Sequence, residues 1–164
     1  MKLARALGLA LVLRAVAGVF PLHAQQRPAH PTDARPPAIS LHQEIDFSAS
    51  PDRVYHALMD SDQFTAFSGR PATIDGAVGG AFSLFSGHIV GRNLELVPQR
   101  RIVQAWRVVD WPEGVYSIAR FDFRAHGSGT RVVLDHTGFP AGLRDHLAAG
   151  WYANYWTLLA RYLR

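Results

Sequence analysis

The stretch LRDHLAAGWYANYWTLLARYL, residues 143–163, carries large apolar side chains at the spacing of an α-helix. Side chains three or four residues apart lie on the same face of a helix. This spacing is followed by Leu143, Leu147, Trp151, Tyr155, Leu158 and Tyr162. The sequence therefore predicts one long helix at the end of the chain, whose aromatic stripe must pack on another layer.

Extended segments precede this helix at regular intervals, separated by turns that contain glycine or proline, such as VPQR and HGSGT. A further strand begins at Ile39, where Leu41, Ile45 and Phe47 share its face and alternate with polar residues. Short strands joined by such turns are typical of an antiparallel sheet. The other predicted strands are residues 80–87, 89–97, 101–109, 115–125 and 130–137.

Two short helices are predicted between the first strand and the rest of the sheet. Ser50 is a favourable N-cap and Pro51 suits the first helical position, so the first helix begins at Pro51. The second helix opens at Ser61 and places Phe64 and Phe67 on one side. The order of elements predicts an α+β fold, in which a curved antiparallel sheet wraps around the long C-terminal helix.

The glycine-rich stretch VGGAFSLFSGHIVG, residues 78–91, raises the alternative of a phosphate-binding loop. Such a loop needs a helix after its glycine turn and, in a P-loop, a lysine followed by serine or threonine. This stretch has no lysine and continues as a strand. Gly79, Gly80, Gly87 and Gly91 are therefore interpreted as positions for bulges and close approach in a bent hairpin.

The first 24 residues have the features of an export signal. Lys2 and Arg5 precede the apolar run ALGLALVL, and Ala24 offers a cleavage point. Arg14 splits the apolar stretch into runs far shorter than the roughly 20 residues of a membrane-spanning helix, so no stable span is expected in the mature chain.

Residues 25–38 contain four prolines and no large apolar side chain, which predicts a disordered linker. One domain would then cover residues 39–164. Cleavage near Ala24 would leave the mature protein in the periplasm or secreted.

Composition excludes several classes of function. Of the 17 lysines and arginines, three lie in residues 1–24, so 14 face 13 acidic residues in the mature chain. The longest basic run is two arginines, too little for a nucleic-acid footprint. The absence of cysteine removes disulfides, thiol catalysis and cysteine-bound metals. His126, His136 and His146 lack metal-ligand spacing, so no metal or cofactor is expected.

Five segments together resemble one known family. In chain order they are ASPDRVYHALMD, VGGAF with GHIVG, RRIVQAWR, GTRVVLDHTGFP and GWYANYW. In this order they are similar to the activator of heat-shock-protein-90 ATPase homologue family (AHSA1-like), within the SRPBCC or START-like superfamily. The resemblance spans residues 39–164 and implies a helix-grip fold, often with an apolar cavity between sheet and C-terminal helix.

Such a cavity would be lined by large apolar side chains of the sheet and helices. Trp106 is a leading candidate, because its indole N–H offers a hydrogen bond to a ligand. The same aromatic side chains would equally fill a solid core. The hypothesis is binding of a hydrophobic or amphipathic small molecule, or of a protein partner, with no catalytic residue. The candidate lining residues are Phe64, Phe67, Phe82, Leu84, Trp106, Phe121, Phe123, Trp151 and Tyr155.

Two other functions stay open on the same resemblance. One is a co-chaperone that stimulates a heat-shock ATPase. Export argues against this function, because that ATPase is cytosolic. The other is a small cavity enzyme of the polyketide cyclase type, with Tyr116, Arg120, Asp122 and His136 as polar candidates. Arg120 and Asp122 alternate with apolar residues, which favours a solvated outer face for them.

Overall fold

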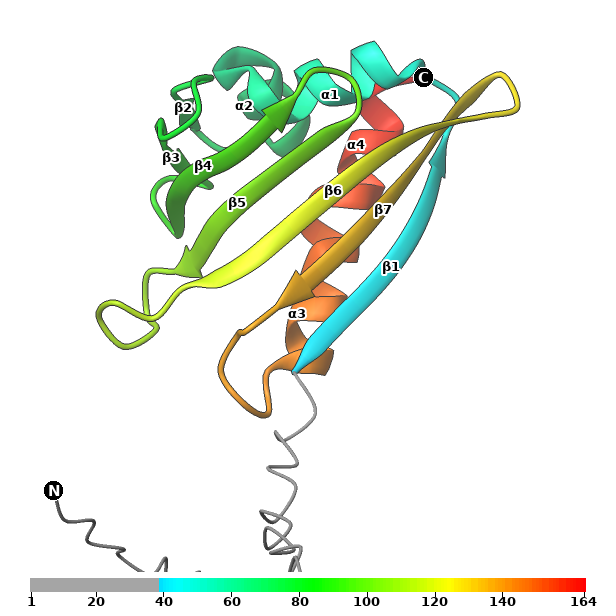
Figure 1. The fold of residues 1–164 in the computed structure, drawn as a ribbon. Coiled ribbons are helices and arrows are strands. Elements are labelled where there is room, and N and C mark those ends of the chain that lie inside the picture. Colours follow the sequence, from blue (N-terminus) through cyan, green and yellow to red (C-terminus); the bar gives the residue numbers. More distant parts are fainter. Residues whose placement is uncertain (1–38) are drawn as a thin grey trace, which may run out of the picture. The chain divides into compact units, whose positions relative to one another are not determined.

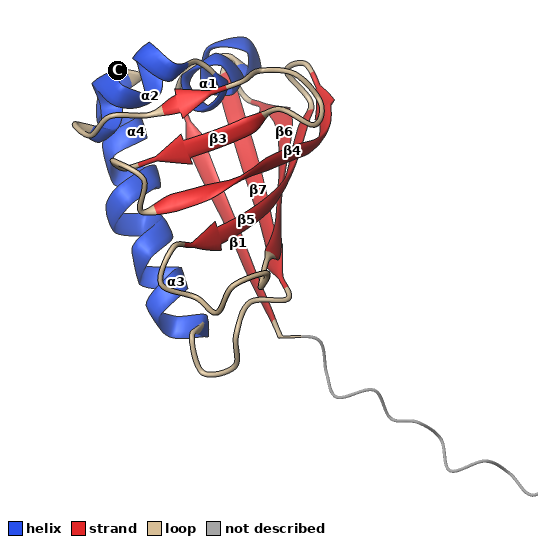
Figure 2. Cartoon of the chain, turned by 90° about the vertical axis from the view of Figure 1, so that its left-hand side faces the viewer, coloured by secondary structure: helices blue, strands red, loops and turns tan. Residues whose placement is uncertain are grey.

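The computed structural model of the protein describes residues 39–164; the predicted signal and linker, residues 1–24 and 25–38, lie outside them. One curved antiparallel sheet wraps around the C-terminal helix, and two short helices lie at one end of the sheet (Figures 1 and 2). The predicted α+β helix-grip fold is confirmed. Within residues 39–164, no helix combines the length and apolar character needed to cross a membrane.

The first strand pairs with the last, and all neighbouring strands in the sheet are antiparallel, in the order β1-β7-β6-β5-β4-β3-β2. The two-residue strand β2 had no counterpart among the predicted strands, because it is too short to show an alternating pattern. The strands are β1 (Ser40–Phe47), β2 (Thr73–Ile74), β3 (Ala81–Leu84), β4 (Ile89–Val97), β5 (Arg101–Val108), β6 (Ser117–His126) and β7 (Gly129–Thr137).

The two short helices begin where their capping residues predict. Helix α1 (Pro51–Met59) follows Ser50, whose side chain accepts a hydrogen bond from a first-turn N–H at 3.4 Å. Helix α2 (Ser61–Ser68) is capped by Asp60, which accepts from the Gln63 N–H at 2.9 Å. Both caps satisfy N–H groups that have no partner inside the helix.

The C-terminal helix is continuous but contains a π-helical turn. It consists of α3 (Arg144–Trp151), the π-helical turn η1 (Tyr152–Trp156) and α4 (Thr157–Tyr162). The Thr157 N–H donates to the Tyr152 carbonyl, five residues earlier instead of four. A π-helical turn therefore interrupts the regular helical spacing from which the apolar stripe was predicted.

This turn shifts the buried face of the helix by one residue. Leu158 and Tyr162 were predicted to lie at the centre of the apolar stripe, but Leu158 only packs partly buried against the core, and the buried positions beyond Tyr155 include Leu159 and Leu163 instead. Tyr162 is 38% exposed. The physical reason is the extra residue in η1, which rotates every later side chain relative to a regular α-helix.

Gly91 allows a close approach in the β3–β4 hairpin. In the sheet register it lies between Phe82 and Trp106. A Cβ atom at this position would lie 2.0 Å from the Ala105 carbonyl oxygen and 2.3 Å from the Phe82 ring. The bulge in β4 falls between Asn93 and Glu95 and not at a glycine. Gly91 thus lets the Phe82 ring pack directly over the strand next to Trp106.

Candidate functional site

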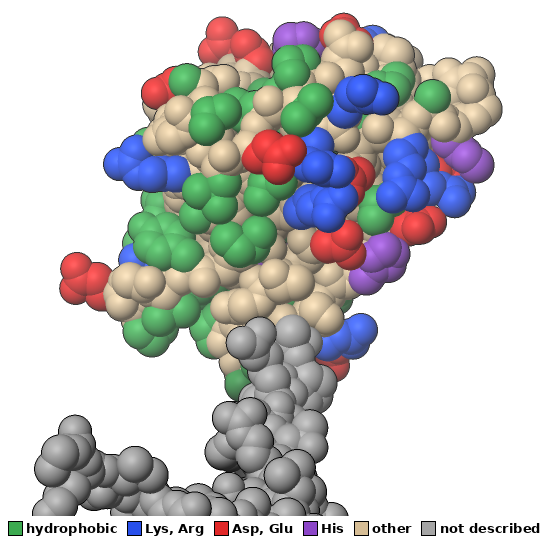
Figure 3. Space-filling view, in the orientation of Figure 1, with side chains coloured by type: hydrophobic (Ala, Val, Ile, Leu, Met, Phe, Trp, Pro, Cys, Tyr) green, Lys and Arg blue, Asp and Glu red, His purple; other side chains and the backbone are tan. Residues whose placement is uncertain are grey.

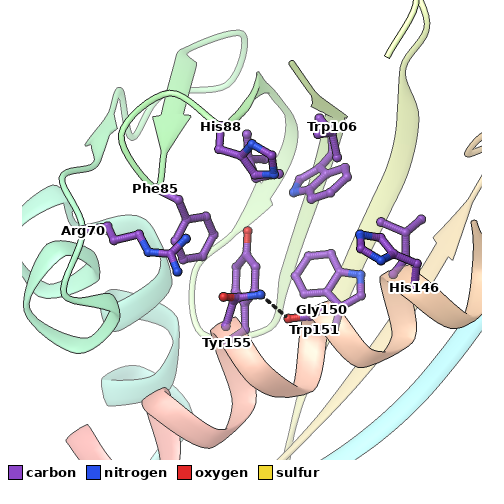
Figure 4. A pocket seen from close by; sticks show the side chains of 12 residues that line it. Arg70, Phe85, His88, Trp106, His146, Gly150, Trp151 and Tyr155 are labelled. Carbon is purple, nitrogen blue, oxygen red and sulfur yellow. Dashed lines mark hydrogen bonds between the residues drawn. The ribbon is translucent and has the colours of Figure 1, made fainter. Parts of the chain in front are cut away.

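A cavity of about 260 Å³ lies between the β3–β4 hairpin, β5 and the C-terminal helix. Its wall is aromatic: Phe85 comes from the hairpin, Trp106 from β5, and Trp151 and Tyr155 from the helix (Figure 4). Tyr155 belongs to the π-helical turn, a feature that is frequent at functional sites. Small-molecule sites are typically concave and apolar with a few placed polar groups.

Two polar atoms in this wall have no partner within the described residues. They are the indole nitrogen Nε1 of Trp106 and the hydroxyl of Tyr155, and both are buried. Burial raises the pKa of the Tyr155 hydroxyl, and the nearby Trp106 N–H opposes part of that rise without reaching hydrogen-bond geometry. The hydroxyl therefore stays protonated. Each such group costs roughly 1–3 kcal/mol while it lacks a partner.

A chain of hydrogen bonds behind the wall fixes Trp106 and Trp151. Nε1 of Trp151 lies 3.1 Å from Nδ1 of His136, and Nε2 of His136 lies 2.7 Å from the Ser117 hydroxyl oxygen. The Ser117 hydroxyl donates to the Trp106 carbonyl at 2.8 Å. Two cavity residues from different elements are thus joined through one buried histidine.

The chain also determines the protonation of His136. An indole nitrogen only donates, so Nδ1 must accept and the proton of the neutral ring sits on Nε2, which donates to Ser117. Burial lowers the pKa of His136 to about 4. His136 is therefore neutral at physiological pH, and both of its ring nitrogens are occupied by structural hydrogen bonds.

An unusual backbone directs Phe85 into the cavity. Strand β3 ends at Leu84, three residues before the predicted end, because Phe85, Ser86 and Gly87 have positive φ of 54°, 59° and 88°. A left-handed conformation costs an ordinary residue roughly 1–2 kcal/mol, and such strain clusters at binding sites. The Phe85 ring is buried 5.0 Å from the Tyr155 ring, between centroids.

The mouth of the cavity is basic. Arg70, which follows α2, places its guanidinium carbon 5.6 Å from the centroid of the Phe85 ring. Exposed His88 and His146 stand on the hairpin and on α3, on other sides of the opening (Figure 4). Among the described residues that line the cavity there is no aspartate or glutamate.

The structure distributes the predicted lining residues over three places. Trp106, Trp151 and Tyr155 line the cavity. Tyr155 also borders, with predicted residues Phe64, Leu84 and Phe121, a deeper void with room for about one water molecule. The other three are buried in the core away from both spaces: Phe67, Phe82 and Phe123.

Sequence reasoning missed Phe85 and the basic mouth. Strand alternation places residue 85 on the face opposite Phe82 and Leu84, and only the left-handed backbone turns its side chain inward. His146 was considered for metal binding alone. Arg70 gave no local signal, because its position at the cavity depends on how α2 packs on the hairpin.

The polar residues considered for a cyclase do not line the cavity. His136 is buried behind the wall, and Tyr116 is exposed. Arg120 and Asp122 lie on the outer face of the sheet, where their side chains form an ion pair of 2.7 Å and Arg101 pairs with the same carboxylate at 2.7 Å. In Figure 3 this face shows basic and acidic side chains interspersed. Arg120 and Asp122 alternate with the core residues Phe121 and Phe123, as predicted for the outer face, but Asp122 is not solvated: it is only 6% exposed beneath its two arginine partners.

No three histidine, aspartate or glutamate side chains of residues 39–164 gather in a group that could hold a metal ion. His136 is buried among aromatic rings, His146 stands at the cavity mouth, and His126 lies on the outer face beside Asp46. The three histidines that are evenly spaced in the sequence thus lie in three different environments.

The sheet, the gripped helix and the cavity between them define a START-like, or SRPBCC-type, helix-grip domain. A family model described as Activator of Hsp90 ATPase homolog 1-like protein matches residues 48–164. The chain belongs to this family.

Curated relatives carry the corresponding name. The human activator of 90 kDa heat shock protein ATPase homolog 1 is 29% identical over 82% of this chain and 42% of its own length. The Dictyostelium discoideum homolog is 32% identical over 73% of this chain and 32% of its own length. The chain therefore spans less than half the length of these relatives.

Solved structures show the same fold. An HSP90 activator from Plasmodium falciparum superposes with a TM-score of 0.67 at 31% identity, covering 71% of this chain and 89% of that one. CalU16 from Micromonospora echinospora also has a TM-score of 0.67, at 23% identity over 77% of this chain and 76% of that one. The second likeness concerns the fold alone.

Proposed function

We propose that this domain binds a hydrophobic or amphipathic small molecule in the cavity between the sheet and the C-terminal helix. The observation that carries the proposal is the pair of buried, unpartnered polar atoms, Trp106 Nε1 and the Tyr155 hydroxyl, in an otherwise aromatic wall. The large majority of buried side-chain polar groups in native proteins have a hydrogen-bond partner. A ligand with an acceptor oxygen would supply the missing partner.

The driving force for binding would be burial of apolar surface, at roughly 25 cal/mol per Å² before the costs of association. The hydrogen bonds to Trp106 and Tyr155 would then set the orientation of the ligand. The hydrogen bonds from Trp151 through His136 and Ser117 to the Trp106 backbone carbonyl orient the Trp151 indole and join the helix to β5 before the ligand arrives. Such preorganisation reduces the entropy lost on binding.

The first experiment is native mass spectrometry of the protein purified from an exporting host, followed by denaturation and extraction of bound molecules. A reproducible apolar or amphipathic adduct, released on unfolding, is the expected result. A clean protein mass, together with no binding in a screen of small aromatic and aliphatic compounds, would overturn the proposal.

A single-atom variant tests the role assigned to Tyr155. Tyr155→Phe removes an unpartnered hydroxyl, so the ligand-free variant should be at least as stable as the wild type. Its affinity for the extracted ligand should fall by roughly five- to tenfold. Tyr162→Phe is the matched control on the same helix, outside the cavity. Lower stability with unchanged affinity would show that the hydroxyl serves the fold and not a ligand.

A second candidate function, regulation of a heat-shock ATPase, is favoured by the names of the relatives and of the Plasmodium falciparum structure. In this function the domain would contact the chaperone as a protein partner. The measurement is ATP hydrolysis by purified Hsp90 with increasing amounts of this protein. A saturable rise in rate would support this candidate, and a flat response up to a large molar excess would exclude it.

We also infer that the protein is exported, from the signal-like pattern of residues 1–24. Export would place the domain where a cytosolic ATPase is absent, and it therefore weighs toward ligand binding. The test is N-terminal sequencing of the protein recovered from the periplasm or medium. A mature chain that begins at Gln25 is expected, whereas an intact cytoplasmic chain would contradict export.

A further inference from the structure

Building on the proposed binding function, we propose that the ligand is a small aromatic carboxylate whose anionic group is held at the cavity mouth by Arg70, His88 and His146. All three side chains line the same opening and come from three separate parts of the fold (Figure 4).

The charge at the cavity mouth favours an anionic ligand. Arg70 carries a fixed positive charge at the mouth, and within residues 39–164 its guanidinium forms no ion pair with a carboxylate. No acidic side chain of this part of the chain lines the cavity. An apolar cavity with a basic opening and no acid favours an anion over a neutral or cationic ligand.

The geometry of Arg70 supports a carboxylate in particular. Its guanidinium lies 5.6 Å from the centroid of Phe85, at a distance that allows a cation–π contact. Packing on a ring limits the positions that the guanidinium can adopt while its N–H groups stay available in the plane. A planar fork of donors of this kind matches the two oxygens of a carboxylate.

Hydrogen-bond donors also dominate deeper in the cavity. The Trp106 N–H can only donate, and the Tyr155 hydroxyl, which stays protonated, has a proton to donate as well. His88 and His146 each add a ring N–H at the mouth. A site with this excess of donors is complementary to a ligand rich in acceptor oxygens.

Size and shape complete the description. An apolar cavity of about 150 Å³ holds a benzene molecule, so about 260 Å³ has room for roughly ten non-hydrogen atoms. The rings of Phe85, Trp106 and Trp151 offer edge and face contacts to a flat aromatic body. The ring system would thus lie inside against these residues, with the carboxylate toward Arg70.

Three probes with one ring system and different charges test this proposal: 2-naphthoate, 2-naphthalenemethanol and 2-naphthylmethylammonium. Binding is followed by intrinsic fluorescence of the full-length protein, because Trp106 and Trp151 line the cavity. We expect 2-naphthoate to bind roughly tenfold more tightly than the alcohol, and the ammonium to bind most weakly. The preference for 2-naphthoate should shrink as the salt concentration rises.

Substitutions at the cavity mouth test whether its basic residues cause the preference for 2-naphthoate. Arg70→Gln should bring the affinity for 2-naphthoate down to about that of the alcohol while the affinity for the alcohol stays unchanged. His146→Gln should lower the affinity for 2-naphthoate by a smaller factor. Arg124→Gln, an exposed arginine on β6 that does not line the cavity, is the control and should behave as the wild type.

The outcomes separate this inference from the function on which it rests. If the alcohol binds as tightly as 2-naphthoate, or if Arg70→Gln leaves their ratio unchanged, the cavity binds ligands but the carboxylate assignment is wrong. If none of the three probes changes the fluorescence at millimolar concentration, the cavity does not accept a ligand of this size. The carboxylate assignment then falls, whereas the proposed function is decided separately by the native mass spectrum and the screen of aromatic and aliphatic compounds.

Discussion

Nε1 of Trp151 lies 3.1 Å from Nδ1 of His136 and donates a hydrogen bond to it, which holds a neutral imidazole inside the core. Burial lowers the pKa of His136 to about 4, whereas the unfolded chain binds this proton near pH 6.5. Between these values only the unfolded chain is protonated. The free energy of unfolding should therefore fall as the pH falls from 6.5 to 4, by about 3 kcal/mol from this group.

Urea unfolding at a series of pH values, for the wild type and His136→Asn, isolates this contribution. The pKa of His42 is raised, mainly by its hydrogen bond to Asp135. Protonation of His42 therefore stabilises the folded protein at low pH, which is opposite to the effect of His136. The two proteins share His42 and all carboxylates, so the difference between their pH profiles belongs to residue 136. Parallel profiles between pH 6.5 and 4 would contradict the assignment.

Sequence patterns predicted the fold because each element carried its own local signal. The Ser50 cap, the alternation in β1 and the aromatic spacing of the C-terminal helix all reflect contacts along the chain. What these patterns could not show is the π-helical turn in that helix, because nothing in a regular 3.6-residue period indicates where an extra residue enters. The resulting error began at Leu158 and extended to the end of the helix.

The candidate site was only partly predictable for a related reason. Trp106, Trp151 and Tyr155 followed from the periodicity of their own elements. Phe85 faces the cavity through a left-handed backbone that breaks strand alternation, and Arg70 reaches it through the packing of α2 on the hairpin. Such contacts are set by the tertiary structure, so they leave no periodic trace in the sequence.

The π-helical turn makes a direct prediction about two neighbouring leucines. Leu159 is completely buried, and Leu158 is half-buried. Leu159→Ala should therefore lower the free energy of unfolding by about 2–5 kcal/mol, and Leu158→Ala by about 1 kcal/mol or less. Thermal and urea unfolding of both variants provide the measurement. A regular helix would give the reverse order, so a larger loss at residue 158 would refute the shifted register.

Gly91 should tolerate no side chain. A Cβ atom there would overlap the Ala105 carbonyl oxygen, which belongs to the backbone of β5 and can move only with the strand. We expect Gly91→Ala to cost about 1–3 kcal/mol or more and to disturb the fluorescence of the adjacent Trp106. Gly76→Ala is the control, because its Cβ would meet no atom within 4 Å. Equal stability of the two variants would mean that the strands are not packed as closely as the structure has them.

Gln43 joins the first strand to the C-terminal helix through two hydrogen bonds. Its side-chain carbonyl accepts from Nε1 of Trp156 at 2.7 Å, and its amide nitrogen donates to the Ala148 carbonyl at 3.1 Å. Gln43→Met keeps the volume but leaves the buried indole N–H without a partner, so the free energy of unfolding should fall by about 1–3 kcal/mol. Gln63→Met, at a half-buried position on α2, should change it by less than about 0.5 kcal/mol. If the two substitutions had the same effect in urea unfolding, the bond to Trp156 would contribute nothing to the attachment of β1, and packing alone would hold strand and helix together.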